Sequence, residues 1–210
     1  MTTQTLCVFA RAPIKGQVKT RLAKALGDDV AMQVYRALLA HTGMVAAKWT
    51  GPVRVFVTGD MNQLHDSKLG AFTLTSQSDG TLGARLLAGV GQTLKTSPSG
   101  VIAIGTDCPR LQLDHLTTLA SGLQHAPVAI GPARDGGYWG IAVNTLAAAK
   151  VCFADDLPWS EPTLMVATRK RLSAAGIPCG HGELLNDLDT VADLNRAEAA
   201  GFRWSDQGTT

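Results

Sequence analysis

The sequence predicts an α/β fold with a mainly parallel central sheet. Short runs of apolar and β-branched residues recur along the 210 residues, and longer stretches with helical periodicity lie between them. Strands that alternate with helices usually pair in parallel, because each helix returns the chain across a face of the sheet. Hydrophobic residues make up 45% of the chain and charged residues 17%, which is typical of a domain with a large core.

Six segments are expected to be strands, since each is a short apolar run: residues 6–9, 53–58, 72–75, 101–105, 128–130 and 139–143. Five segments are expected to be helices: residues 22–47, 82–95, 113–124, 163–175 and 191–200. In the first of these, apolar residues such as Tyr35 and Leu39 recur at helical intervals, so that face belongs to the core. Residues 60–68 are expected to form a turn and a short helix.

The length and composition predict one domain, residues 1–203, followed by a loose polar tail, residues 204–210. The net charge of +2 and the aromatic content of 5% argue against nucleic acid as a partner. No apolar run approaches the roughly 18 residues of a membrane span, and no signal-peptide pattern is present, so we expect a cytoplasmic protein without a membrane partner. The four cysteines lack the spacing of a zinc site. A homodimer is left open.

The loop after the first expected strand carries four positive charges: Arg11, Lys15, Lys19 and Arg21. In an open α/β sheet, ligands bind at the carboxyl ends of strands, where helix N-termini and cations attract phosphate groups. We therefore expect a polyphosphate here, with Gly16 allowing close approach of the backbone. Neither a Walker A loop nor a G-x-G-x-x-G turn is present, so cationic side chains would hold the ligand. The alternative is a solvated basic loop.

Asp107 follows the expected strand at residues 101–105 and so lies in the ligand crevice at the carboxyl end of that strand. A lone carboxylate beside a polyphosphate suits Mg²⁺, which takes one or two carboxylates together with phosphate oxygens and waters. The alternative is an Asp that only forms a turn, since Pro109 follows closely. Further along, Asp189 and Thr190 could cap the helix that is expected from residue 191.

Residues 131–140 combine a turn with charged and aromatic side chains. Asp-Gly is a strong hairpin signal, so a plain hairpin is one interpretation. A hairpin does not require the neighbouring Arg and Tyr, and such a loop offers a charge, a carboxylate and a stacking face to an acceptor or a sugar. We expect acceptor contacts from Arg134, Gly136, Gly137 and Tyr138. Asp135 would orient an acceptor hydroxyl or accept its proton, or it would be a ligand of a nearby Mg²⁺, and an Arg there would favour an anionic acceptor.

A glycine-rich element, residues 77–85, follows the expected strand at 72–75 and opens a helix. Its amide and hydroxyl groups lie where the base or ribose of a nucleotide could bind. We therefore expect nucleotide contacts from Gln77, Gly80, Leu82 and Gly83. The same pattern is also typical of an ordinary turn followed by a helix N-cap.

Taken in order, these segments resemble a known bacterial transferase family. The matching residues are 12–13 (AP), 16–22 (GQVKTRL), 77 (Q), 80–83 (GTLG), 105–109 (GTDCP), 131–138 (GPARDGGY), 159–160 (WS) and 187–190 (DLDT). The chain is similar to the radical-SAM/selenodomain-associated transferase 1 family, the DUF2064 glycosyltransferase-like proteins of the nucleotide-diphospho-sugar transferase superfamily. That family is similar in turn to 2-phospho-L-lactate guanylyltransferase and to the molybdenum-cofactor guanylyltransferases.

The resemblance implies a GT-A fold, which is a Rossmann-like α/β/α sandwich. It also implies a Mg²⁺ or Mn²⁺ site: in sugar nucleotidyltransferases of this superfamily, one metal-binding Asp ends a central strand and another lies near the C-terminus. Asp107 and Asp189 occupy the matching places. Trp159 and Ser160 match a Trp-Ser-Thr segment and are expected to contact the acceptor, although Glu161 replaces the Thr here.

We therefore expect a Mg²⁺-dependent transferase that acts on an NTP or an NDP-sugar and on a small-molecule acceptor. Lys19, Asp107 and Asp135 are the expected catalytic residues. Nucleotidyl transfer to a small anionic acceptor is slightly favoured, because the cations of the first loop suit a triphosphate. Glycosyl transfer from an NDP-sugar and a non-catalytic nucleotide-binding protein are the alternatives.

Overall fold

The computed structural model describes residues 3–204 of the chain. A seven-stranded sheet forms its centre, in the order β3-β2-β1-β4-β6-β5-β7. The strands are β1 (Thr5–Arg11), β2 (Val53–Thr58), β3 (Thr73–Ser76), β4 (Val101–Ile104), β5 (Val128–Pro132), β6 (Tyr138–Val143) and β7 (Cys179–His181). Within residues 3–204, only β6 runs antiparallel to its neighbours, β4 and β5, and the other four strand pairs are parallel. The predicted α/β class with a mainly parallel sheet is confirmed.

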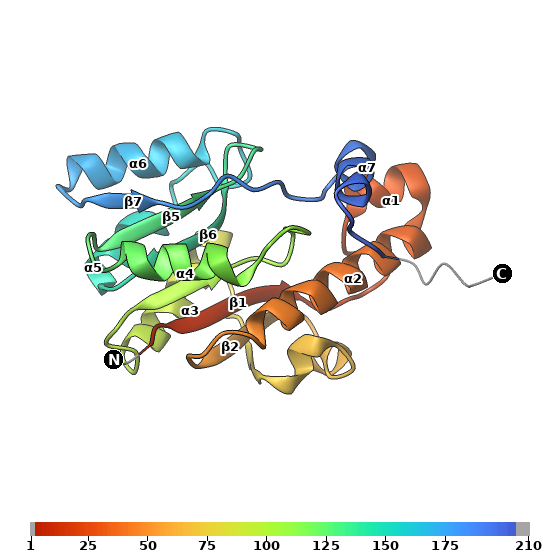
Figure 1. Cartoon of the computed structure of the whole chain (residues 1–210), viewed down its shortest axis with the longest axis horizontal. Coiled ribbons are helices and arrows are strands. Elements are labelled where there is room, and N and C mark those ends of the chain that lie inside the picture. Colours follow the sequence, from red (N-terminus) through yellow and green to blue (C-terminus); the bar gives the residue numbers. More distant parts are fainter. Residues whose placement is uncertain (1–2, 205–210) are drawn as a thin grey trace.

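Helices cover both faces of the sheet (Figure 1). They are α1 (Thr20–Leu26), α2 (Asp28–Ala46), α3 (Leu82–Leu94), α4 (Leu113–Gly122), α5 (Leu146–Cys152), α6 (Leu164–Ala174) and α7 (Val191–Ala199). Helices α2 and α4 pack with Leu6 and Val8 of β1 on one face. Helices α3, α5 and α6 pack with Cys7 and Phe9 on the other face. Residues that alternate along β1 are therefore buried on both sides, as in other parallel strands.

A third, smaller core joins the two ends of the chain. Leu22 of α1 and Leu38 of α2 pack there with Leu188, which precedes α7, and with Leu194 of α7. Figure 1 shows α7 beside α1, although they lie at opposite ends of the sequence. This packing brings the loop before α1 next to the segment before α7, and both segments carry predicted site residues.

The structure differs from the predicted elements in four places. The helix expected over residues 22–47 is two helices, because Gly27 has a φ of 87° and breaks the run between α1 and α2. Helix α5 and strand β7 were not expected, since the first is only seven residues long and the second three. Residues 60–68 contribute to two 3-10 helices, η1 (Met61–Leu64) and η2 (Lys68–Ala71). Apart from Trp204, the tail expected at residues 204–210 lies outside the described residues.

Within residues 3–204, no helix is both long and apolar enough to cross a membrane.

Candidate active site

Two adjoining hollows lie at the carboxyl ends of β1 and β4. The first, the basic hollow, has a volume of about 500 Å³ and is lined by Arg11, Lys19 and Arg21 among others. The second, the aromatic hollow, has a volume of about 440 Å³ and is lined by aromatic residues that include Tyr138 and Trp159. The residues that line both hollows are Phe9, Arg21, Leu82, Asp107, Ser160 and Asp189. The two predicted metal ligands therefore stand where the hollows meet.

Lys19 joins these two carboxylates. Its Nζ donates to Asp107 Oδ1 at 2.5 Å and to Asp189 Oδ1 at 2.9 Å. The Lys19 side chain is only 4% exposed, whereas those of Asp107 and Asp189 are 49% and 47% exposed. The backbone of Lys19 is left-handed, with a φ of 46°, which is uncommon for a residue with a side chain. The start of α1 thus holds this lysine in an unusual conformation that directs its ammonium between the two carboxylates.

The charge of Lys19 is secured by its partners. Burial by itself would lower the pKa of the ammonium, but the charges of Asp107 and Asp189 and their hydrogen bonds outweigh it and raise the pKa above its ordinary value. Lys19 is therefore protonated and positively charged at neutral pH. The sequence predicted that Lys19 contacts phosphate and that the two aspartates bind a metal ion. It contained no signal that these three side chains contact one another.

Asp189 reaches this centre because a neighbour takes over the helix cap. The side chain of Thr190 accepts from the backbone N–H of Asp193, and Asp193 Oδ2 accepts from the N–H of Thr190 in a capping box. The N–H of Leu188 donates to the carbonyl of Asp107 at 2.9 Å, which ties the two loops together. The cap is thus Thr190, and the side chain of Asp189 turns to Lys19.

Asp187 is a further acidic residue of the aromatic hollow that sequence reasoning did not assign. Its Oδ1 accepts from the thiol of Cys108 at 2.8 Å. Burial raises the pKa of Asp187 to about 6, with added repulsion from Asp107 and Asp135. Burial also raises the pKa of Cys108, so this thiol is a protonated donor and not a nucleophile. The alternation of Asp187 and Asp189 about the buried Leu188 is the sequence signal that could have identified it.

The donors present fit a hard divalent cation with substrate. Among the described residues, no group of three or more His, Cys, Asp or Glu side chains could hold a metal ion alone. Asp107 and Asp189 offer two half-exposed carboxylates. Mg²⁺ commonly takes one or two carboxylates and completes its shell with phosphate oxygens and waters, so this pair meets that need once a phosphate is present.

The basic loop does not enter the hollow as a whole. Arg11 and Arg21 line the basic hollow together with Lys19. Lys15 instead pairs with Asp29 at 2.6 Å on the exposed surface. Gly16 lies beside Lys15 in the turn, with a φ of 77° that suits glycine, and it does not line the hollow.

The glycine-rich element is also divided. Gln77 lines the basic hollow, but its Nε2 donates to the carbonyls of Ala10 and Phe56, so part of its amide holds strand ends in place. Leu82 lines both hollows. Gly80 lies in a separate small hollow. Gly83 is packed under Trp159, whose Nε1 would be 2.7 Å from a Cβ at that position.

The loop between β5 and β6 is both a hairpin and a wall of the aromatic hollow. Asp135 and Gly137 line the hollow, and Asp135 Oδ1 accepts from the N–H of Gly137 at 2.9 Å. Gly136 packs against the backbone of Pro162, where a Cβ would collide. Arg134 is exposed and lines neither hollow; its backbone N–H donates to the carbonyl of Leu185. The expected acceptor contact from the Arg134 guanidinium is therefore not supported by its position.

Tyr138 and Trp159 form one aromatic wall. Their ring centroids lie 6.1 Å apart in an edge-to-face arrangement. The Trp159 Nε1 donates to the carbonyl of Ala154, and the Tyr138 hydroxyl donates to that of Cys152. Ser160, which follows Trp159, has a φ of 65° and stands at the boundary of the two hollows. The predicted residues Trp159 and Ser160 are thus brought to the same place as Asp135 and Tyr138.

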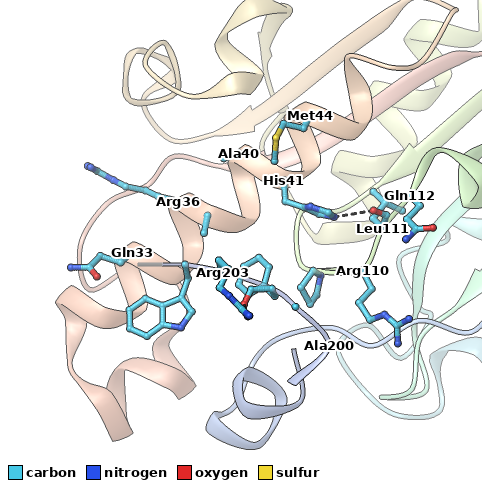
Figure 2. Close-up of a pocket in the computed structure, with 15 residues that line it drawn as sticks. Gln33, Arg36, Ala40, His41, Met44, Arg110, Leu111, Gln112, Ala200 and Arg203 are labelled. Carbon is cyan, nitrogen blue, oxygen red and sulfur yellow. Dashed lines mark hydrogen bonds between the residues drawn. The ribbon is translucent and has the colours of Figure 1, made fainter. Parts of the chain in front are cut away.

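A larger hollow, of about 930 Å³, lies elsewhere, between α2, the loop before α4 and the segment after α7. None of the predicted site residues lines it. Figure 2 shows His41 donating toward Leu111, while the side chains of Arg36 and Arg110 point away from one another. These two guanidinium groups do not converge on one ligand, so we place the candidate site at the two smaller hollows.

Comparison with protein families shows which family the sequence matches. The family described as "Uncharacterized protein conserved in bacteria (DUF2064)" matches residues 38–161. A comparison with curated proteins found no match.

Solved structures show the same fold. A proposed nucleotide-diphospho-sugar transferase from Desulfovibrio desulfuricans G20 is 26% identical, with a TM-score of 0.87 over 98% of this chain and 92% of that one. The inositol-1-phosphate CTP transferase from T. maritima is 12% identical, with a TM-score of 0.59 over 100% and 99% of the two chains. Rv0371c from Mycobacterium tuberculosis H37Rv, solved with manganese, is 14% identical, with a TM-score of 0.56 over 93% and 98%. These likenesses agree with the predicted GT-A architecture.

Proposed function

The chain belongs to the DUF2064 family, and we propose that it is a divalent-metal-dependent transferase that acts on a nucleotide. One observation carries the proposal: Lys19, Asp107 and Asp189 meet where a basic hollow and an aromatic hollow join. A transferase must bring a phosphorylated donor and an acceptor to one point. A basic hollow that adjoins an aromatic hollow offers a separate site for each of the two substrates. The transferase class also agrees with the named relatives of nucleotidyl and sugar type.

The basic hollow would hold the phosphates. Arg11, Lys19 and Arg21 line it, and charge-assisted hydrogen bonds from such groups are among the stronger contacts that proteins make to phosphate. The same cations would stabilise the negative charge that develops on a departing phosphate, which is the largest catalytic term in many transferases. Binding of a nucleotide by the T. maritima CTP transferase, which shares this fold, supports the assignment.

Asp107 and Asp189 would hold Mg²⁺ or Mn²⁺ together with the phosphates. The bound metal would supply a Lewis acid that neutralises phosphate charge. The manganese in the structure of Rv0371c supports a divalent metal on this fold.

The lining of the aromatic hollow favours glycosyl transfer for the finer chemistry. Among the residues that the structure describes, Arg21 is the single cation of its lining, and the lining carboxylates are Asp107, Asp135, Glu161, Asp187 and Asp189. Such a lining disfavours a phosphorylated or carboxylated group, whereas carboxylates and aromatic faces suit the hydroxyls and apolar faces of a sugar. The likeness to the proposed nucleotide-diphospho-sugar transferase points the same way.

In this reaction the acceptor hydroxyl attacks the anomeric carbon of an NDP-sugar. The bond between that carbon and the β-phosphate oxygen breaks, and the NDP leaves with the bonding electron pair. Asp135 would take the proton of the acceptor hydroxyl, because its carboxylate lines the hollow and is exposed. Arg11, Lys19 and Arg21 would stabilise the departing diphosphate.

Nucleotidyl transfer is the second candidate, and the three cations of the basic hollow favour it, since they suit a triphosphate. Its acceptor would have to be uncharged at the part that enters the aromatic hollow.

Calorimetry with NTPs and NDP-sugars, each with and without Mg²⁺, tests the class. Product analysis then separates the reactions: release of NDP from an NDP-sugar indicates glycosyl transfer, and release of pyrophosphate from an NTP indicates nucleotidyl transfer. Absence of binding to every nucleotide at millimolar concentration would reject both reactions.

A further inference from the structure

Lys19 occupies one oxygen atom of each of the two carboxylates that would hold a metal ion. Its ammonium takes Oδ1 of both Asp107 and Asp189, at 2.5 Å and 2.9 Å. Any cation held by these two carboxylates competes with Lys19 for them. We infer that Lys19 is an internal counter-cation, which holds the two carboxylates together in the metal-free protein and moves to the substrate phosphates when a divalent ion takes its place. This inference rests on the proposed function for both the metal ion and the phosphates of the exchange.

Electrostatics requires a cation at this point. Two carboxylates directed at one place repel each other, and Lys19 cancels one of their two charges. The ammonium in turn is only 4% exposed, and a buried charge is costly unless it is paired. Both sides of the contact therefore depend on each other until another cation, or another anion, is supplied.

The lysine side chain is suited to such an exchange. It is a compact charge on a flexible stem, so its ammonium can change partners while the backbone stays in place. The backbone is fixed by its surroundings, since Val18 is buried and α1 begins at Thr20. The φ of 46° at Lys19 is a conformation that only a well-determined environment maintains. Lys19 also lines the basic hollow, where the phosphates are proposed to bind, so its ammonium would reach them without leaving this hollow.

The exchange predicts coupling between the two ligands. A metal ion that releases Lys19 makes it available to phosphate, and a phosphate that binds Lys19 frees the carboxylates for the metal. Such coupling is reciprocal by thermodynamic necessity. A lysine that only binds phosphate would not compete with metal, and a permanent structural ion pair would exclude metal altogether.

Arg21 provides a matched control. It lines both hollows beside Asp107 and Asp189, but within residues 3–204 it forms no ion pair with either of them. Removing Arg21 therefore removes one nearby positive charge without freeing the carboxylates.

The first test is Mn²⁺ binding without nucleotide, followed by electron paramagnetic resonance, for the parent, Lys19→Met and Arg21→Met proteins. We expect Lys19→Met to bind Mn²⁺ at least about tenfold more tightly than the parent, which is within the usual range of coupling between sites. Arg21→Met should stay within about threefold of the parent. The thermal midpoint of Lys19→Met should be lower than that of the parent without metal and should recover with Mn²⁺. Equal Mn²⁺ affinity in Lys19→Met and Arg21→Met would overturn the inference.

A second measurement on the parent protein covers the case in which Lys19→Met does not fold. The buried ammonium should give a slowly exchanging ¹⁵Nζ signal, and saturating Mg²⁺ with a nucleoside diphosphate should shift it. An unchanged signal while both ligands bind would show that Lys19 does not move. Failure of Mn²⁺ to bind any of the three proteins would also overturn the inference, whereas the nucleotide panel tests the transferase separately.

Discussion

The ammonium of Lys19 lies 2.5 Å from the Asp107 carboxylate, although 88 positions separate the two residues in the sequence. The contact follows from the sheet, because β1 and β4 are parallel neighbours whose carboxyl ends lie at the same edge. Lys19 stands in the loop after β1, and Asp107 in the loop after β4. Asp189 joins them from the far end of the chain through the packing of α7 on α1. The candidate site is therefore assembled from three loops.

Asp107→Asn should remove the Mg²⁺ dependence of nucleotide binding and leave the fold intact. The amide keeps the shape of the side chain, and the carbonyl of residue 107 still accepts from Leu188, but the charge that the metal needs is lost. Calorimetry with and without Mg²⁺ measures the effect, and circular dichroism checks the fold. Asp114→Asn, at an exposed residue of α4, is the matched control. Unchanged Mg²⁺-dependent binding would make Asp107 a turn residue only.

Arg21→Ala should weaken binding of nucleoside triphosphates more than of monophosphates. A charge-assisted contact is worth roughly 1.5–3 kcal/mol, so we expect a loss of about tenfold or more. Lys15→Ala removes the same charge from the same loop, but Lys15 pairs with Asp29 outside the hollow and should have little effect. Fluorescence or calorimetric titration compares them. Equal losses in both variants would indicate a general surface field instead of a site.

Asp135→Asn should lower turnover by about a hundredfold or more, the usual scale for a general base, with nucleotide affinity within about twofold. The Asn oxygen can still accept from the N–H of Gly137, so the turn should persist. Arg134→Ala changes the neighbouring exposed side chain and should leave turnover unchanged, because Arg134 lines neither hollow. Steady-state kinetics distinguishes them. A larger loss of turnover in Arg134→Ala than in Asp135→Asn would indicate that Arg134 contacts the acceptor.

Thr190→Ala and Asp189→Asn should impair different properties, the first stability and the second metal binding. Thr190 caps α7, so its loss should cost about 1 kcal/mol of unfolding free energy and leave metal binding unchanged. Asp189→Asn should impair metal binding with a smaller change in stability, since the capping box does not use its side chain. Denaturant unfolding and Mn²⁺ titration together check this. Unfolding of Asp189→Asn would favour a structural role.

His41→Gln should make stability less dependent on pH. Burial lowers the pKa of His41 below its ordinary 6.5, so as the pH falls the unfolded chain takes up a proton first. The stability that the neutral imidazole contributes is present above about pH 6.5 and is lost as the pH falls below it. Glutamine keeps a donor toward the carbonyl of Leu111 but does not titrate. Melting curves at pH 7.5 and 5 should converge more closely for the variant.

The sequence by itself determined most of the strands and helices and the edge of the sheet at which the candidate site lies. Apolar periodicity is a local property, and it predicted strands at 53–58 and 101–105, which the structure shows as β2 and β4, and the helices that cover them. The rule that ligands lie at the carboxyl ends of parallel strands then placed the basic loop and Asp107 at one edge. The break at Gly27 was not predicted because the apolar pattern continues across it. The φ of 87° that ends the helix there is a property of the folded backbone.

The tertiary structure decided which charges meet. Lys15 and Lys19 stand in one basic loop, yet the first pairs with Asp29 at the surface and the second with Asp107 and Asp189 in the site. Likewise Arg134 is exposed outside the hollows, while the next residue, Asp135, lines one of them. These outcomes depend on backbone angles, on a helix cap and on packing between distant segments. The residue types alone specify the charges that are available, and only the folded chain sets the distances at which they act.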